Sequence, residues 1–222
     1  MSCNLFLNYY LDKSPDRQLE LDFCLTENLK NESIDYVVLV CSSAHLDIAK
    51  EKFESHSEKI IPVILEHRPT YNSFFHLTRY FAQSDDLNII CNTDMIVPVE
   101  TIRLSPLYLK NRSFCLALSR WDIHQSDNYK HNAALFDRHD SQDTWIFQGQ
   151  VPNISGADFT LGVAGCDNKI AHLLEAHGYS VINPSRTLKT YHFHLTNVRN
   201  YVENGRPKEI IPPPYKLIPT TE

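Results

Sequence analysis

The sequence has 222 residues, which is enough for one domain with a substantial buried core. Its net charge of -6 argues against a nucleic-acid partner, because phosphate contacts need a basic surface. No apolar run approaches the ~20 residues that span a membrane, and the N-terminus lacks the pattern of a secretory signal. The six cysteines show no CxxC spacing, so we expect buried free thiols in a soluble, cytoplasmic protein.

The first half of the chain alternates apolar runs with helical segments. Buried or half-buried strands are predicted at 4–10, 36–41, 60–65 and 87–91. Helices are predicted at 17–29 and at about 70–82, with Thr70 or Asn72 as a suitable N-cap of the second. This alternation predicts an α/β fold with helices that flank a mainly parallel central sheet.

The stretch 87–97 is the most informative part of this half. Its apolar run, 87–91, is typical of a strand buried on both faces, and it ends at Asn92-Thr93-Asp94. Open α/β sheets bind ligands at the carboxyl ends of their strands, which is where Asp94 falls. Asn92 and Asp94 lie two residues apart, so on an extended chain they would share one side and one ligand. The alternative is a simple turn that both side chains stabilise.

The second half is less regular. We expect strands at 113–119 and 179–184, and a helix at 169–177 that Gly178 ends. A long polar segment, 122–143, lies between the first strand and an aromatic run, and loops of this length are usually functional or mobile. The alternation in Tyr191-His192-Phe193-His194 places both histidines on one face, before a Pro-rich end.

Three polar clusters need a common explanation: Asn92 with Asp94, Asp167 with Asn168 at a helix start, and His192 with His194. A carboxylate with imidazole, and positions left for a ligand, suits Mn²⁺ or Mg²⁺, which would hold a phosphate or diphosphate. The glycine-rich loops match neither a Walker A nor a dinucleotide motif. Asp167 could act as a general base or cap the helix. Together these features predict group transfer from an activated nucleotide.

These residues resemble the motifs of the GT-A glycosyltransferases. Asn92-Thr93-Asp94 is similar to the DxD motif, with Asn in place of the first acid; Gly165-Cys166-Asp167-Asn168 is similar to the segment that activates the acceptor. More narrowly, segments spread over about 1–201 resemble small glycosyltransferases of large algal viruses and bacterial relatives. These segments are Thr70-Tyr71-Asn72, Asn92-Thr93-Asp94, 118–122, 141–147, 165–168, Asn183-Pro184-Ser185 and His192-Phe193-His194.

The resemblance implies a single GT-A domain over 1–205, with a Rossmann-like nucleotide-binding half (about 1–100) and a smaller acceptor half (about 101–205). Residues 206–222 would form a Pro-rich tail. A metal held by Asp94 and by His192 or His194 would bind a nucleotide-sugar donor, with UDP-sugars favoured. A glycan or protein-linked glycan hydroxyl would then be glycosylated by inverting displacement, with Asp167 as the base.

The chemistry of other side chains suggests further site residues. Tyr9 or Tyr10 would stack on the base, while one of the two points into the core. Asn92, Thr93, Arg79, Arg120 and Arg199 are candidates for the diphosphate, although Arg120 could simply pair with Asp122. Sugar or acceptor contacts are expected from Asp143, Trp145, Asp122 and Asn168, although Trp145 could equally be a core residue.

Two other functions stay open. A nucleotidyltransferase shares the Rossmann-like half and an acidic metal site, but it should carry a Gly- and Lys-rich signature near the first strand. The segment 4–17 has no glycine. A non-catalytic module that binds nucleotide-sugars or carbohydrate would bind its ligand without turnover.

Overall fold

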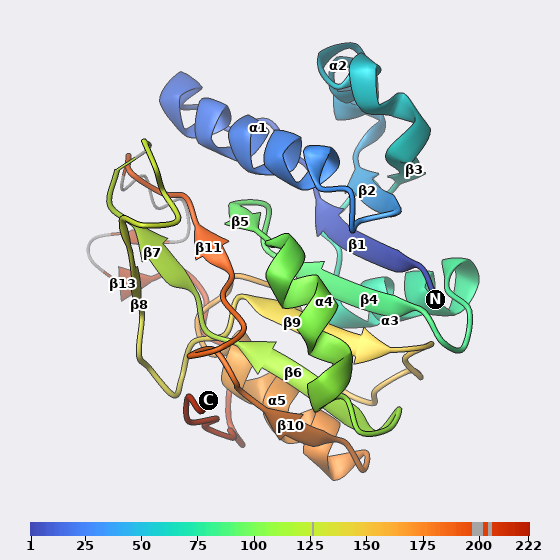
Figure 1. The fold of residues 1–222 in the computed structure, drawn as a ribbon, viewed down its shortest axis with the longest axis vertical. Helices are drawn as coiled ribbons and strands as arrows, with labels where there is room; N and C mark the ends of the chain where they lie inside the picture. The colour runs from blue at the N-terminus through green and yellow to red at the C-terminus, as the bar shows by residue number, and fades with distance from the viewer. Residues whose placement is uncertain (126, 197–201, 204–205) are drawn as a thin grey trace.

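The computed structural model describes residues 1–125, 127–196, 202–203 and 206–222. Its largest element is a seven-stranded sheet, built in the order β10 (Ser180–Ile182), β6 (Phe114–Leu118), β9 (Thr144–Gln148), β4 (Leu87–Cys91), β1 (Cys3–Asn8), β2 (Tyr36–Cys41) and β3 (Ile60–Ile64). Only β9 among these strands runs antiparallel to its neighbours, β4 and β6. The predicted α/β class with a mainly parallel central sheet is confirmed (Figure 1).

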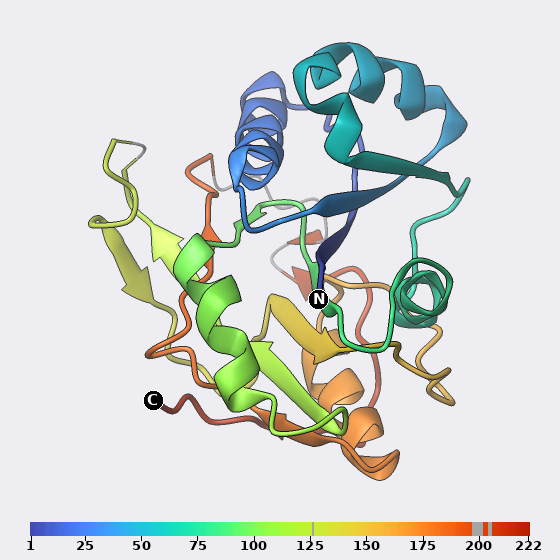
Figure 2. The ribbon, with the colours of Figure 1, turned by 45° about the vertical axis from the view of Figure 1, so that its right-hand side comes forward.

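Both faces of this sheet are buried, because alternate residues of each strand enter different cores. In β4, Ile89 packs in one core and Ile90 in the other. Helices α1 (Pro15–Lys30) and α4 (Val99–Tyr108) cover the first face, and α3 (Tyr71–Phe81) and α5 (Cys166–Ala176) cover the second. Figure 2 shows these two layers of helices on either side of the sheet. The prediction that 87–91 is a strand buried on both faces is therefore confirmed.

Local signals fix where the helices begin. Pro15 occupies the first position of α1, and the Ser14 hydroxyl accepts the Arg17 N–H at 3.4 Å. Thr70 and Ser73 form a reciprocal capping box at the start of α3, so Thr70 rather than Asn72 is the cap. Helix α5 begins three residues earlier than predicted, after Gly165 in the left-handed conformation.

Sequence patterning missed one helical region. Helix α2 (Ser43–Lys52) and the 3-10 helix η1 (Glu54–Lys59) connect β2 to β3. Only Ala49 of α2 is buried, so the helix lacks the periodic apolar face by which a helix is recognised in sequence.

A small second sheet lies beside the carboxyl end of β4. Its order is β5 (Met95–Ile96), β11 (Tyr191–His192), β7 (Trp121–Ile123) and β8 (Ala133–Leu135), so the predicted polar segment 122–143 contributes two short strands. β11 runs antiparallel to β5, and His192 is paired with Met95. This pairing brings the His192 region next to Asp94, which precedes β5 directly.

The C-terminal residues lie along the same fold. After a short hairpin, β12 (Val202–Glu203) and β13 (Arg206–Pro207), the backbone N–H groups of Ile211, Ile218 and Thr221 donate to Ala164, His139 and Asn183. Ile211 and Ile218 are buried. The segment predicted as a Pro-rich tail is therefore bonded to the loop that leads into α5, to the loop before β9 and to the residues that follow β10. Within the described residues, no helix has the length and apolar character needed to cross a membrane.

Candidate active site

A cavity of about 740 Å³ opens at the carboxyl end of the central sheet, at the ends of β1 and β4. This is the position at which open α/β sheets bind ligands. The cavity brings together ten residues that the sequence analysis predicts for the site: Tyr9, Tyr10, Asn92, Thr93, Asp94, Arg120, Asp143, Asp167, His192 and His194.

Asp94, His192 and His194 form a cluster in which three potential metal-ligand atoms lie within 4.8 Å of one another. The His192 Nε2 atom is 3.3 Å from the Asp94 carboxylate, and the Phe193 N–H donates to the Asp94 carbonyl at 3.0 Å. The alternation of 191–194 thus presents both imidazoles to Asp94. One carboxylate and two imidazoles are a donor set that suits a divalent transition-metal cation, of which Mn²⁺ is one.

Asp94 is ionised and His194 is neutral, so both side chains are in the protonation state that a metal ligand needs. Burial disfavours the charged form of Asp94, but His192 and Arg17 outweigh it and hold the pKa of this carboxyl well below its usual range. Burial, reinforced by Arg17 and His192, lowers the pKa of His194, so its imidazole is neutral and able to ligate. Its Nε2 atom is buried and has no hydrogen-bond partner among the described residues, an unsatisfied position that a cation would fill.

His192 is oriented from its other side by Asp122. The Nδ1 atom lies 2.7 Å from the Asp122 carboxylate, which leaves Nε2 directed at Asp94. Burial would lower the pKa of His192, but Asp94 and Asp122 outweigh it and raise the pKa to about 9. A carboxylate behind a ligating histidine is the usual outer shell of a metal site. Asp122 therefore contacts His192 and does not itself line the cavity, whereas the sequence analysis expects it to contact sugar or acceptor.

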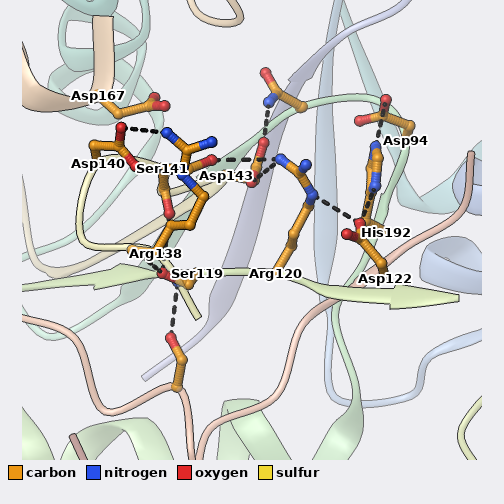
Figure 3. Close-up of polar contacts among 12 residues, drawn as sticks. Asp94, Ser119, Arg120, Asp122, Arg138, Asp140, Ser141, Asp143, Asp167 and His192 are labelled. Atoms are coloured by element: carbon orange, nitrogen blue, oxygen red, sulfur yellow. Dashed lines mark hydrogen bonds and ion pairs between the residues drawn. The ribbon is translucent and has the colours of Figure 1, made fainter. Parts of the chain in front are cut away.

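Arg120 connects this cluster to the opposite part of the cavity. Its guanidinium bonds to Asp122 at 2.8 Å and to Asp143 at 3.1 Å, and Asn92 donates to Asp143 at 3.0 Å. Figure 3 shows the resulting chain of contacts from Asp143 through Arg120, Asp122 and His192 to Asp94. The predicted surface pairing of Arg120 with Asp122 is present, but it is a partly buried pairing inside the site.

Asp167 lies in the first turn of α5 and lines the same cavity. The N-cap of α5 is Gly165, so the alternative in which Asp167 caps the helix is wrong. Burial, and then the negative charge of Asp143, raise the pKa of Asp167 to about 8, although the Cys166 thiol donates to it at 3.2 Å. A general base works best when its pKa lies near the working pH, and a pKa of about 8 meets this condition in mildly alkaline solution.

Three other predicted residues lie elsewhere. The Arg79 guanidinium donates to the Val151 carbonyl at 3.0 Å, and Trp145 is 1% exposed in the core, against Tyr71. Asn168 lies on a separate shallow hollow beside the C-terminal segment. None of the three lines the large cavity, so Trp145 takes the alternative role of a core residue. Arg199 lies outside the described residues.

Of the two tyrosines, Tyr9 points inward. It is fully buried, its hydroxyl donates to Asp22 at 2.9 Å, and its ring packs edge-on against Phe53. Tyr10 is half-buried at the cavity wall, where burial and the charge of Asp94 raise its pKa. Thr93 uses its hydroxyl to bond the Asn8 carbonyl and so ties β4 to β1.

Three arginines of the cavity are absent from the sequence-based set. Arg17 donates to the Asp94 carboxylate, Arg68 to the Leu161 carbonyl, and Arg138 pairs with Asp140 at 2.6 Å. Arg17 carries a weak sequence signal, because it places a cation in the first turn of α1, where the helix dipole disfavours it. Arg68 and Arg138 have no such signal.

The fold, with its mainly parallel seven-stranded sheet, is the Rossmann-like fold that GT-A glycosyltransferases and nucleotidyltransferases share. No protein-family model matches the sequence. No curated protein matches it either. The structure is similar to that of the mannosyltransferase PcManGT from Pyrobaculum calidifontis, solved in complex with GDP-Man and Mn²⁺ (TM-score 0.52, 13% identity). The match covers 82% of this chain and 54% of the mannosyltransferase, so the chain spans about half of that protein's length.

A second likeness is to 4-diphosphocytidyl-2C-methyl-D-erythritol synthase from Anaerococcus prevotii. It has a TM-score of 0.50 and 14% identity, and covers 88% of this chain and 91% of the synthase. Another structure of this type of synthase gives the same TM-score at 15% identity, with 85% and 92% covered. Likenesses at this level of identity establish the fold.

Proposed function

We propose that the protein is a metal-dependent glycosyltransferase that moves a sugar from a nucleotide diphosphate donor to a hydroxyl acceptor. One observation carries the proposal: a single cavity contains both the Asp94, His192 and His194 cluster and Asp167, whose pKa is raised to about 8. Inverting glycosyl transfer uses these two functions together, one at the leaving diphosphate and one at the attacking hydroxyl.

Asp94, His192 and His194 would hold Mn²⁺ or Mg²⁺. When bound, the cation neutralises charge on the leaving diphosphate. Arg17, Arg68 and Arg120 line the same cavity and supply further positive charge for the phosphate oxygens. The Asn92 amide bonds to Asp143, so Asp94 is the carboxylate that this motif offers a cation.

Asp167 would accept the proton of the acceptor hydroxyl as that oxygen attacks the anomeric carbon, which gives a single displacement with inversion. The acceptor would be a glycan or protein-linked glycan, next to Asp143 and Arg138. A UDP-sugar as the donor stays a prediction from the sequence. Location in the cytoplasm stays a prediction from the sequence.

Nucleotidyl transfer is the second candidate, supported by the fold likeness to the diphosphocytidyl-methylerythritol synthases. Two features weigh against it. The segment 4–17 has no glycine, and none of the described residues that line the cavity is a lysine. A glycine- and lysine-rich loop near β1 is what we expect of a nucleotidyltransferase. A non-catalytic sugar-nucleotide module would not need a carboxyl with the raised pKa of Asp167.

Calorimetry with nucleoside diphosphates, with and without Mn²⁺, tests the donor half of the proposal. We expect UDP or GDP to bind with Mn²⁺, and the Asp94→Ala variant to lose this binding. Asp167→Asn should keep the binding and lose turnover. Metal-dependent binding that survives in Asp94→Ala would contradict the proposed cation site, and normal turnover by Asp167→Asn would contradict its role as base.

A further inference from the structure

Glu20 connects helix α1 to the segment that carries His194. Its side chain is buried, and its carboxylate accepts four hydrogen bonds. Oε1 accepts the backbone N–H groups of Leu195 and Thr196, both at 2.7 Å. Oε2 accepts the Thr196 hydroxyl at 3.0 Å and the Arg17 guanidinium at 2.7 Å. The carboxylate is thus fully used in these contacts and is not part of the cavity lining.

His194 is fixed on both sides along the chain. Before it, the Phe193 N–H donates to the Asp94 carbonyl at 3.0 Å, and the Phe193 carbonyl accepts from Arg17 at 3.3 Å. After it, the Leu195 N–H donates to Glu20. Hydrogen bonds to both neighbours restrict the backbone of His194 and so the direction of its side chain. Helix α1, about 175 residues earlier in the chain, therefore sets where this imidazole lies.

We propose that Glu20 is a positioning residue of the cation site. By holding the Leu195 and Thr196 backbone, it places the His194 Nε2 atom within reach of a cation at Asp94 and His192. This inference rests on the proposed function, because it assigns Glu20 to the metal site on which that function depends. Outer-shell residues of this type change metal affinity by about 10–100-fold.

Metal binding to the full chain tests the proposal directly, without any assay of transfer. The Kd for Mn²⁺ would be measured by calorimetry for the wild type, Glu20→Ala, His194→Ala and the double variant. Glu20→Ala should weaken binding about 10–100-fold. If Glu20 acts through His194, the double variant should bind no more weakly than the weaker single variant. Glu32→Gln is the matched control, because Glu32 follows α1 and its side chain is 80% exposed.

The visible spectrum of bound Co²⁺ gives a second readout that a general loss of stability would not reproduce. Loss of an imidazole ligand changes the spectrum, so Glu20→Ala should give the spectrum of His194→Ala. If Glu20→Ala does not unfold cooperatively, Glu20→Asp replaces it. This variant keeps the charge but shortens the side chain by one methylene, and it should raise the Kd towards the value of Glu20→Ala, by up to about 10-fold.

The outcomes separate the two proposals. A wild type that binds neither Mn²⁺ nor Co²⁺ would overturn the cation site, and with it both the proposed function and the role of Glu20. If the wild type binds Mn²⁺ and Asp94→Ala does not, the cation site stands. In that case, a Glu20 variant with the Kd and spectrum of Glu32→Gln would overturn the positioning role alone. Fully additive effects of Glu20→Ala and His194→Ala would also overturn it.

Discussion

His192 and Asp122 form a 2.7 Å hydrogen bond between Nδ1 and Oδ1, while the opposite ring nitrogen of His192 lies 3.3 Å from Asp94. The two strands that carry His192 and Asp122 are paired in the small sheet, with these two residues in register. Backbone pairing therefore fixes the distance between imidazole and carboxylate. This makes the orientation of His192 a property of the sheet as well as of the hydrogen bond.

Removing Asp122 should weaken the cation site without removing a ligand. Above about pH 9, where His192 has lost its proton, we expect Asp122→Ala to raise the Kd for Mn²⁺ about 10–100-fold, because the imidazole loses its orienting partner. Calorimetry measures the effect. Asp85→Ala removes a carboxylate from an exposed ion pair with Arg112 and should leave the Kd unchanged. Equal Kd values for the two variants would mean that the His192–Asp122 bond does not support metal binding.

Mn²⁺ binding should release a proton from His192. Its pKa of about 9 in the metal-free protein means that the imidazole is protonated at pH 7 and must lose this proton to ligate. Affinity should therefore rise about tenfold per pH unit from pH 7 to about 9 and then level off. Calorimetry in buffers of different ionisation enthalpy counts the protons released. No release at pH 7 would show that His192 is not a ligand.

The rate of transfer should follow the ionisation of Asp167. Its pKa is raised to about 8, so the carboxyl is mostly protonated below that pH and cannot act as base. We expect kcat/KM to increase about tenfold per pH unit up to about pH 8. Because the charge of Asp143 contributes to the raised pKa of Asp167, Asp143→Asn should shift the rising part of the pH profile to lower pH. A profile that is flat between pH 6.5 and 9 would contradict the assignment.

The C-terminal segment should be sensitive to a side chain at Gly165. A Cβ atom there would lie 2.8 Å from both the Ile211 carbonyl and the Tyr215 hydroxyl, and φ is +81°. We expect Gly165→Ala to destabilise the fold by about 1–3 kcal/mol and to lower activity, because Asp167 lies two residues later. Urea unfolding measures the first effect.

Gly178→Ala provides the matched control for this prediction. Gly178 has a similar φ of +88°, but a Cβ atom would meet nothing within 4 Å. Gly178→Ala should lower the free energy of unfolding only through backbone strain, by about 1 kcal/mol, and should leave the activity unchanged. Equal effects of the two substitutions on stability and activity would show that contact with the C-terminal segment is unimportant.

The parts of the fold that sequence predicts are those with strong local signals. The apolar run 87–91 and the Thr70 cap lie where their patterns place them. The direction of β9 has no such signal, because an apolar run packs equally well in either direction, and only its neighbours β4 and β6 fix it. The polar helix α2 was missed for the corresponding reason: it has almost no buried face.

The same distinction applies to the site. Asp94, His192 and His194 are predictable because each follows a recognisable strand pattern and carries a metal-ligating group. Arg17 and Glu20 act through contacts with residues far along the chain, at Asp94 and Thr196, which local sequence cannot show. Arg79 is the opposite case. The sequence predicts it for the site, but its guanidinium bonds to the carbonyl of Val151, in a loop far along the chain.

Identification of the released product tests the central proposal most directly. The protein would be incubated with Mn²⁺, a panel of nucleotide-sugars and simple sugar acceptors, and the products followed by phosphorus NMR. Glycosyl transfer predicts release of a nucleoside diphosphate, with loss of the signal in Asp94→Ala. Pyrophosphate formed from a nucleoside triphosphate and a sugar phosphate, with no nucleoside diphosphate released from any donor, would contradict it and indicate nucleotidyl transfer.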